Sequence, residues 1–159
     1  MRKSRLLLVL VAVALIIFGL IYILDPTSLP VDNDSEDKAF IEFPNGQIVT
    51  ADIADDEVSR NTGLSNREQI GEYEGLLFLH ETKDQHSYWM KDMLFAIDII
   101  WIDGDIVTGF SENIPPENPA STIYSPEVPV NHVLEVQAGF VDEIGLLVGD
   151  QLDIQLPEQ

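Results

Sequence analysis

Residues 95–103, FAIDIIWID, constrain the fold most strongly, because this run has the length of a β-strand and is apolar on both sides. Along an extended chain, alternate side chains point to opposite faces of a sheet. One face receives Phe95, Ile97, Ile99, Trp101 and Asp103, and the other receives Ala96, Asp98, Ile100 and Ile102. A strand with two apolar faces belongs in the middle of a sheet. We therefore predict a central strand in which Asp98 is at least half buried.

Shorter strand and turn patterns surround this run. The predicted strands are 40–43, 47–54, 75–80, 85–90, 106–110, 132–136 and 151–156, with helices from an N-cap at Asp55 to Gly63 and over 139–145. Asn45-Gly46 and Asp103-Gly104 are typical of tight hairpin turns. The five prolines of residues 111–130 favour an irregular excursion. Together these patterns predict a mostly β domain, a compact barrel or sandwich with two short helices.

The N-terminus has a different composition. Arg2, Lys3 and Arg5 precede the uncharged run Leu6–Leu24, which approaches the ~20 apolar residues that cross a bilayer. A cleavable signal peptide has a shorter apolar core, of roughly 7–15 residues. We therefore expect a cytoplasmic basic tail (1–5), a transmembrane helix (6–24), an acidic linker (25–39) and an extracytoplasmic domain (40–159). The chain is expected in the cell membrane as a single-pass protein, with cleavage as the alternative.

The region after residue 24 is strongly acidic. It holds all 28 acidic residues and five of the eight basic ones, a formal charge of −23. Such a charge repels phosphates and anionic lipid, so nucleic acid is not an expected partner. The acids are scattered rather than spaced as a calcium loop requires, which favours a salt-adapted surface over cation capture. The chain has no cysteine, which excludes disulfides and thiolate chemistry.

Four segments in this order resemble a known family. They are ADIADDEVSRNTGLSNRE, EGLLFLH, YWMKDMLFAIDIIWID and IYSPEVPVNHVLEVQAGFVDEIGLLVGDQLDI, within residues 40–156. They are similar to the uncharacterised family catalogued as domain of unknown function 192. The resemblance implies a small, secreted or membrane-anchored, β-rich single domain. It implies no biochemical activity, because the family has none assigned. This chain departs from the pattern in the acidity of its surface.

A small set of polar and aromatic side chains forms the candidate site. If 85–91 and 95–103 form a hairpin through DMLF, Lys91 and Asp98 can approach each other. Glu135, within the apolar run VLEV, needs a partner for the same reason as Asp98, since a buried unpaired charge costs several kcal/mol. One hypothesis is a ligand site formed by Trp89, Lys91, Asp98, Trp101, Tyr124 and Glu135, suited to a neutral polar ligand such as a glycan. The competing hypothesis is an internal network that fixes strand register.

Signals for catalysis are weaker than signals for binding. Asp98 and Glu135 are the alternative catalytic pair, as in glycoside hydrolysis. His80, His86 and His132 are the only histidines, the spacing from His80 to His86 is not that of ligands on a helix face, and each fits equally well at a strand end, so we predict no metal site and no cofactor. Ser125 is followed by Pro126 and has no nucleophile elbow around it. We expect a non-enzymatic binding module for a glycan-like ligand or an envelope protein, with a hydrolase as the alternative.

Overall fold

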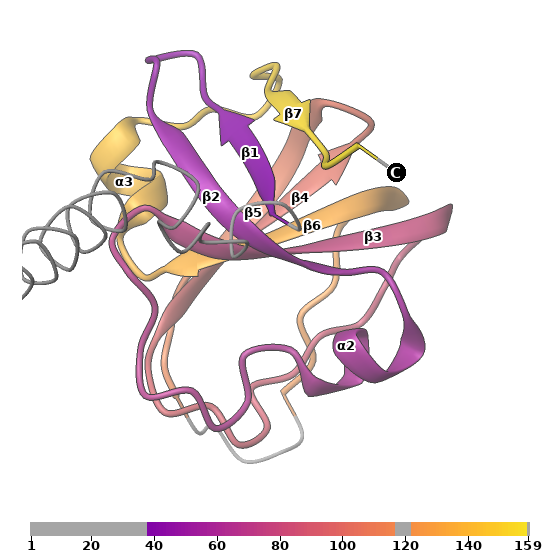
Figure 1. The fold of residues 1–159 in the computed structure, drawn as a ribbon, viewed down its shortest axis with the longest axis vertical. Coiled ribbons are helices and arrows are strands. Elements are labelled where there is room, and N and C mark those ends of the chain that lie inside the picture. Colours follow the sequence, from indigo (N-terminus) through magenta and orange to yellow (C-terminus); the bar gives the residue numbers. More distant parts are fainter. Residues whose placement is uncertain (1–37, 117–121, 159) are drawn as a thin grey trace, which may run out of the picture. The chain divides into compact units, whose positions relative to one another are not determined.

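The computed structural model describes residues 38–116 and 122–158. The predicted tail and anchor, and the linker up to residue 37, lie outside the described residues. Seven described strands form one curled sheet (Figure 1): β1 (Ala39–Glu42), β2 (Ile48–Ala54), β3 (Glu74–Asp84), β4 (Ile97–Asp103), β5 (Ile106–Ile114), β6 (Val130–Gln137) and β7 (Asp153–Gln155). The described helices are α2 (Glu57–Thr62) and α3 (Phe140–Ile144). The prediction of a mostly β domain with two short helices is confirmed.

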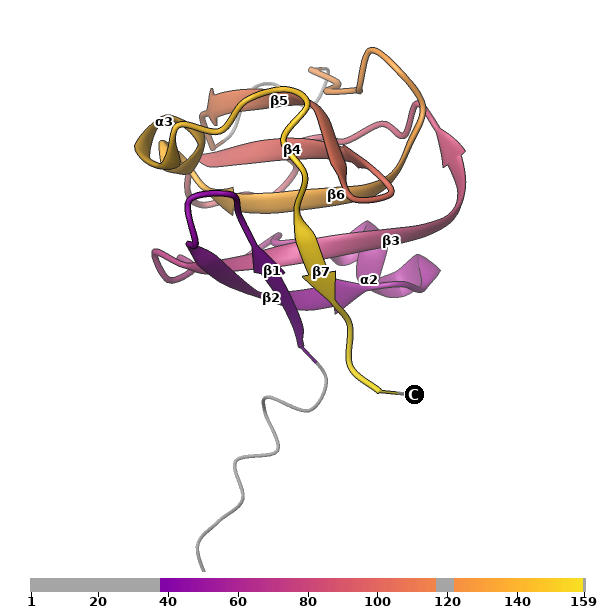
Figure 2. The ribbon, with the colours of Figure 1, turned by 90° about the horizontal axis from the view of Figure 1, so that it is seen from above.

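The sheet curls until its two ends meet at one corner. Its strand order is β5-β4-β6-β3-β2-β1-β7, and Figure 2 shows the curvature from above. A bridge between Ile106 and Gln151 links the start of β5 to the segment before β7. The backbone N–H of Leu152 donates to the carbonyl of Asp105 at 2.8 Å beside this bridge. The sheet is therefore a half-barrel whose edges are joined at one corner.

Among the described strands, β2 and β3 pair in parallel and the other pairs are antiparallel. Parallel neighbours need a crossover connection. Residues 55–73 supply it and include α2. Asp56, rather than the predicted Asp55, is the N-cap of α2, because its Oδ1 accepts from the N–H groups of Val58 (2.6 Å) and Ser59 (2.9 Å).

Both faces of the sheet are apolar and covered. The concave face holds one cluster of buried residues: Ala39, Ile41, Phe43, Val49, Ala51, Leu77, Ile100, Ile102, Val107, Leu134, Val136, Phe140, Val141, Leu146 and Leu152. The other face holds the second: Ala54, Leu64, Ile70, Leu76, Phe78, Met90, Met93, Ile97, Ile99, Trp101, Ile114, Val130 and Val133. β4 contributes alternate residues to each and lies between β5 and β6. The prediction of a central strand at 95–103 is confirmed.

The predicted hairpin of 85–91 with 95–103 is wrong. β3 ends at Asp84, and the segment after it forms only an isolated bridge between Tyr88 and Tyr124. Their backbones exchange two hydrogen bonds, of 2.8 and 2.9 Å. Segment 85–96 therefore lies over the sheet as a covering loop, and β4 takes its partners from β5 and β6.

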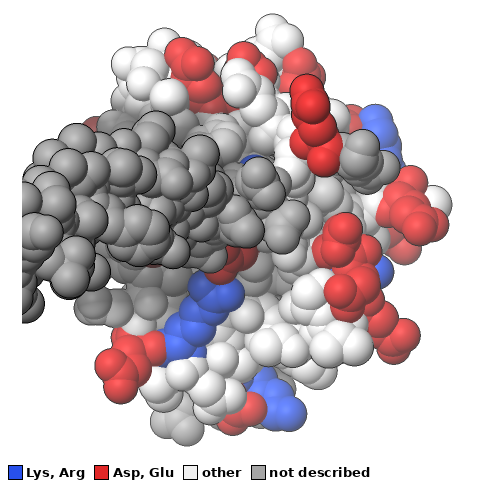
Figure 3. All heavy atoms as spheres, in the orientation of Figure 1, with Lys and Arg blue, Asp and Glu red and all other residues white. Residues whose placement is uncertain are grey.

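The described surface is acidic in many separate places. Figure 3 shows Asp and Glu side chains spread over the described part of one face, with few Lys and Arg among them. Within residues 38–116 and 122–158, no helix has the length and apolar character needed to cross a membrane.

Candidate functional site

A pocket of about 420 Å³ opens on the face of the sheet that carries the second cluster. The crossover residues 57–65 form one wall, and residues 86–89 with Met93 form another. The lining residues are Glu57, Arg60, Asn61, Thr62, Gly63, Leu64, Ser65, Phe78, His80, His86, Ser87, Tyr88, Trp89, Met93, Ile123 and Glu135. Strands β3 and β6 supply Phe78, His80 and Glu135. The pocket is thus a space between the sheet and the loops that cover it.

Glu135 is the buried acid of this pocket. In the sheet register it pairs with Leu76 of β3 and Ile99 of β4, both apolar. The residue is 6 % exposed, and its carboxyl group makes no hydrogen bond to another described residue. Burial raises its pKa from 4.5 to about 8, against a smaller lowering effect of the Arg67 charge. The carboxyl group is therefore mainly protonated and neutral at pH 7.

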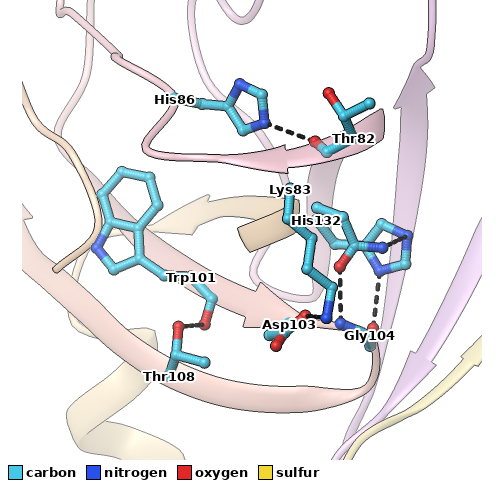
Figure 4. Close-up of polar contacts among 9 residues, drawn as sticks. Thr82, Lys83, His86, Trp101, Asp103, Gly104, Thr108 and His132 are labelled. Carbon is cyan, nitrogen blue, oxygen red and sulfur yellow. Dashed lines mark hydrogen bonds and ion pairs between the residues drawn. The ribbon is translucent and has the colours of Figure 1, made fainter. Parts of the chain in front are cut away.

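Tyr88 and two histidines form a connected polar group beside Glu135. The Tyr88 hydroxyl lies 2.8 Å from Nε2 of His80. The rings of His80 and His86 stack with centroids 3.5 Å apart and planes 9° apart. Nε2 of His86 donates to the carbonyl of Thr82 at 3.2 Å, a contact drawn in Figure 4. These contacts fix the orientation of three lining side chains.

The electrostatics of this group also favour neutral forms. Burial, followed by the neighbouring His86 and Arg60, lowers the pKa of His80 from 6.5 to about 4. Burial and the charge of Glu135 raise the pKa of Tyr88 well above its ordinary value. At pH 7 the pocket therefore presents a neutral carboxyl, a neutral imidazole and a neutral phenol.

The mouth of the pocket is apolar and partly exposed. Trp89 is 52 % exposed and Ile123 is 51 % exposed, and both line the pocket. At the rim, the guanidinium group of Arg60 donates to the carbonyl oxygens of Asp55 and Leu79. These two bonds hold the Arg60 side chain against the backbone. An incoming molecule thus meets an indole face before it meets the polar floor.

The structure brings together only part of the predicted ligand site. Trp89 and Glu135 line the pocket. Trp101 is 3 % exposed and packs on Tyr88, with ring centroids 5.6 Å apart, behind the lining residues. The backbone of Tyr124 pairs with that of Tyr88. These two residues support the pocket wall without lining it.

Lys91 and Asp98 do not meet each other, contrary to the predicted approach. Lys91 is exposed, and its backbone carbonyl accepts from Ser65 Oγ at 2.9 Å. Asp98 is fully buried on the concave face. Its partners are backbone N–H groups: Asn113 at 2.7 Å to one carboxylate oxygen, and Gly139 at 3.1 Å and Val141 at 3.0 Å to the other.

The geometry also separates the alternative catalytic pair. Asp98 pairs in register with Val136 and Glu135 pairs with Ile99, so the two acids alternate to opposite faces of the sheet. The carboxyl group of Asp98 fixes the N-terminus of α3, and that of Glu135 faces the pocket. The two carboxyl groups are not positioned to act on one substrate.

The third histidine, His132, lies apart from the stacked pair of His80 and His86. His132 lies near the start of β6, where it pairs with Ile102 of β4, and its Nδ1 bonds to the carbonyl of Gly104 at 2.8 Å (Figure 4). Lys83 forms an ion pair with Asp103 at the same turn. Among the described residues, no group of three or more His, Asp or Glu side chains is placed to hold a metal ion.

The pocket also holds Tyr88, His80 and Arg60, which were not among the predicted site residues. His80 follows Phe78 by two positions, which places both side chains on the same face of β3. That alternation was a usable signal for His80. Arg60 and Tyr88 reach the pocket through loop and crossover geometry, which residue spacing does not encode.

Comparisons with known proteins identify relatives of this domain. A crystal structure from Sinorhizobium meliloti, described as a candidate transcription regulator, has a TM-score of 0.66 and 28 % identity, covering 74 % of this chain and 92 % of that one. A protein of unknown function from Novosphingobium aromaticivorans has a TM-score of 0.65 and 24 % identity, covering 73 % and 83 %. Comparison with curated proteins gives no match. The model of the family DUF192, described as "Uncharacterized ACR", matches residues 40–154, and the chain therefore belongs to this family.

Proposed function

We propose that this domain is a non-enzymatic binding module that takes a neutral, polar, glycan-like ligand in the pocket beneath Trp89. The observation that carries the proposal is Glu135, a buried carboxyl group that faces the pocket without a hydrogen bond to another described residue. Buried polar groups in folded proteins are nearly always hydrogen-bonded, and an exception at a pocket favours a ligand as the missing partner.

The charge state of the pocket supports a neutral ligand. The pKa of Glu135 is raised to about 8 and that of His80 is lowered to about 4, so neither side chain is mainly charged at pH 7. Trp89 adds a half-exposed aromatic face of the kind on which sugar rings stack. A ligand with hydroxyl groups and one apolar face suits both features.

A saccharide-binding experiment tests this function. The full chain in detergent micelles is screened against a panel of neutral saccharides, and binding is followed through tryptophan fluorescence. Trp89→Ala should weaken binding at least tenfold, because the exposed indole face is lost. Lys91→Met is the matched control, since Lys91 lies near Trp89 but does not line the pocket. Failure of every saccharide to bind, or equal binding by Trp89→Ala, would refute the proposal.

We also propose that residues 6–24 anchor the domain in the cell membrane with residues 40–159 outside. The basic tail before an uncharged run of nineteen residues supports this orientation. The full chain should sediment with membranes, resist extraction by high salt and keep its N-terminus. A soluble form that begins near Leu15 or Asp25 would contradict it.

A further inference from the structure

We infer that Glu135 donates a hydrogen bond to its ligand, and that the group it recognises is a neutral oxygen acceptor such as a carbonyl or hydroxyl oxygen. This inference rests on the proposed function and specifies which end of the ligand reaches the floor of the pocket. Glu135 is then the residue that selects neutral ligands over charged ones.

The half-buried polar side chains of the pocket already have partners, whereas the lining residues Glu57 and Asn61 are exposed to water. The Tyr88 hydroxyl is bonded to His80, the His86 N–H is bonded to Thr82, and the Arg60 guanidinium is bonded to two backbone carbonyls. Glu135 has no such bond to a described residue. A bound ligand would cover the Glu135 carboxyl group, and a ligand atom therefore gains most by pairing with it, because leaving it covered and unpaired costs free energy that a hydrogen bond recovers.

The protonated form of Glu135 determines the direction of this bond. The titratable or charged groups near it are Glu57 and Arg60 of α2, Arg67 of the following loop, His80 of β3, and His86 and Tyr88 of segment 85–96. Burial outweighs the attraction of Arg67, so the pKa lies near 8 and the carboxyl carries its proton at pH 7. A protonated carboxyl offers an O–H donor to the ligand.

Charged head groups fit this arrangement poorly. An ammonium group has no acceptor for the Glu135 proton, and it can form an ion pair only if the carboxyl loses that proton beside the apolar side chains of Leu64, Phe78 and Met93. A carboxylate must leave water and enter a domain of strongly negative charge. A neutral amide or hydroxyl oxygen avoids both costs.

Three small probes of similar size test the selection by charge. The full chain in micelles, at constant salt and pH 7, is titrated with acetamide, acetate and methylammonium. Binding is followed by NMR at the Glu135 side-chain carboxyl carbon and the Trp89 indole N–H. We expect saturable shifts with acetamide and none with the two ions. A stronger response to either ion, or no response to any of the three probes, would overturn the inference.

The pH dependence of acetamide binding identifies the donor. The affinity of the natural protein should fall about tenfold between pH 7 and pH 9, as the proton leaves Glu135. Glu135→Gln supplies a permanent N–H donor of similar shape and should bind acetamide within about threefold of the natural protein, with no such fall. An affinity that rises with pH would show that the ionised carboxylate is the binding form and would refute the inference.

The two proposals fail in different ways. If acetamide behaves as expected but no saccharide binds, the glycan-like ligand is wrong and Glu135 still selects a neutral acceptor. If saccharides bind with the same affinity at pH 7 and pH 9, binding is confirmed and the role of Glu135 as donor is refuted.

Discussion

Two buried acids on neighbouring strands, Asp98 of β4 and Glu135 of β6, have opposite surroundings. Asp98 accepts three backbone hydrogen bonds on the concave face, at 2.7, 3.0 and 3.1 Å. Glu135, on the other face, accepts none from a described residue and faces a pocket. Both residues are nearly or fully inaccessible, so burial does not distinguish them.

The difference shows that N–H donors decide the role of a buried carboxyl. Asn113, Gly139 and Val141 direct their backbone N–H groups at Asp98, so both of its carboxyl oxygens have partners and it holds the start of α3 against the sheet. Among the described residues no such donor reaches Glu135, and burial favours the neutral form of its carboxyl. Two acids that appear equivalent in the sequence thus have separate surroundings: Asp98 has a structural role, and Glu135 is the acid for which we propose a binding role.

Among the substitutions that test this difference between the two acids, removal of Asp98 should cause the largest loss of stability. Asp98→Ala leaves three backbone N–H groups without their acceptor and should lower the free energy of unfolding by about 3–5 kcal/mol, since each unsatisfied buried donor costs about 1–3 kcal/mol. Urea unfolding measures the loss, with Glu112→Ala at an exposed site of β5 as the control. A loss below about 1 kcal/mol would mean that Asp98 is as dispensable as an exposed acid.

Glu135→Gln should change how the free energy of unfolding varies with pH, rather than the highest value that this free energy reaches. The folded pKa, about 8, lies above the ordinary value of 4.5, so the folded state binds the proton more tightly. Its contribution is complete below pH 4.5 and is lost as pH rises to 8, with a slope of up to about 1.4 kcal/mol per pH unit. Urea unfolding from pH 6.5 to 8 should show a shallower decline for Glu135→Gln, and parallel curves would contradict the raised pKa.

The urea-unfolding measurement begins at pH 6.5 because the contribution of His80 changes below that pH. Its folded pKa, about 4, lies below the ordinary 6.5, so its contribution is lost as pH falls from 6.5 towards 4. Below pH 6.5 the two residues change stability in opposite directions. Above it, the natural protein and Glu135→Gln differ mainly through the carboxyl.

Tyr88→Phe tests whether the polar group beside Glu135 contributes to stability. The variant removes the 2.8 Å hydrogen bond to His80 and leaves a part-buried imidazole nitrogen without it, which should cost about 1 kcal/mol. Tyr73→Phe is the matched control, because the Tyr73 hydroxyl bonds only to exposed glutamates. Equal melting temperatures for the two variants would show that the bond at His80 contributes nothing.

Lys91→Met should have the smallest effect. Lys91 is exposed and its side chain does not pair with Asp98, so the change should stay within about 0.5 kcal/mol. Thermal unfolding measures it. A clear loss of stability would restore the hypothesis that Lys91 belongs to an internal network with the buried acids.

Much of the fold was predictable because hydrophobic alternation encodes it. The two apolar faces of β4, the turn at Asp103-Gly104 and the helix over 139–145 all follow from local patterns. The predicted strand at 85–90 was wrong because its aromatic residues suit a strand as well as they suit a loop that covers the sheet. In the folded chain Met90 packs in the second cluster and Tyr88 in the pocket wall, so tertiary contacts override the local pattern.

The candidate site was predictable only in part. Trp89 and Glu135 were identified because an aromatic beside a charge, and an acid in an apolar strand, are unusual in sequence. The donors to Asp98 were not identifiable, because they are backbone groups of Asn113, Gly139 and Val141 that only the fold brings near.

The pairing of β1 with β7 has a mechanical consequence. Phe40 pairs with Gln155 and Glu42 pairs with Asp153, so the chain enters and leaves the domain at neighbouring points (Figure 2). Tension applied between residues 38 and 156 would load this antiparallel pair at its open end and break its bonds one after another. Held at one end alone, the domain transmits no load through this pair.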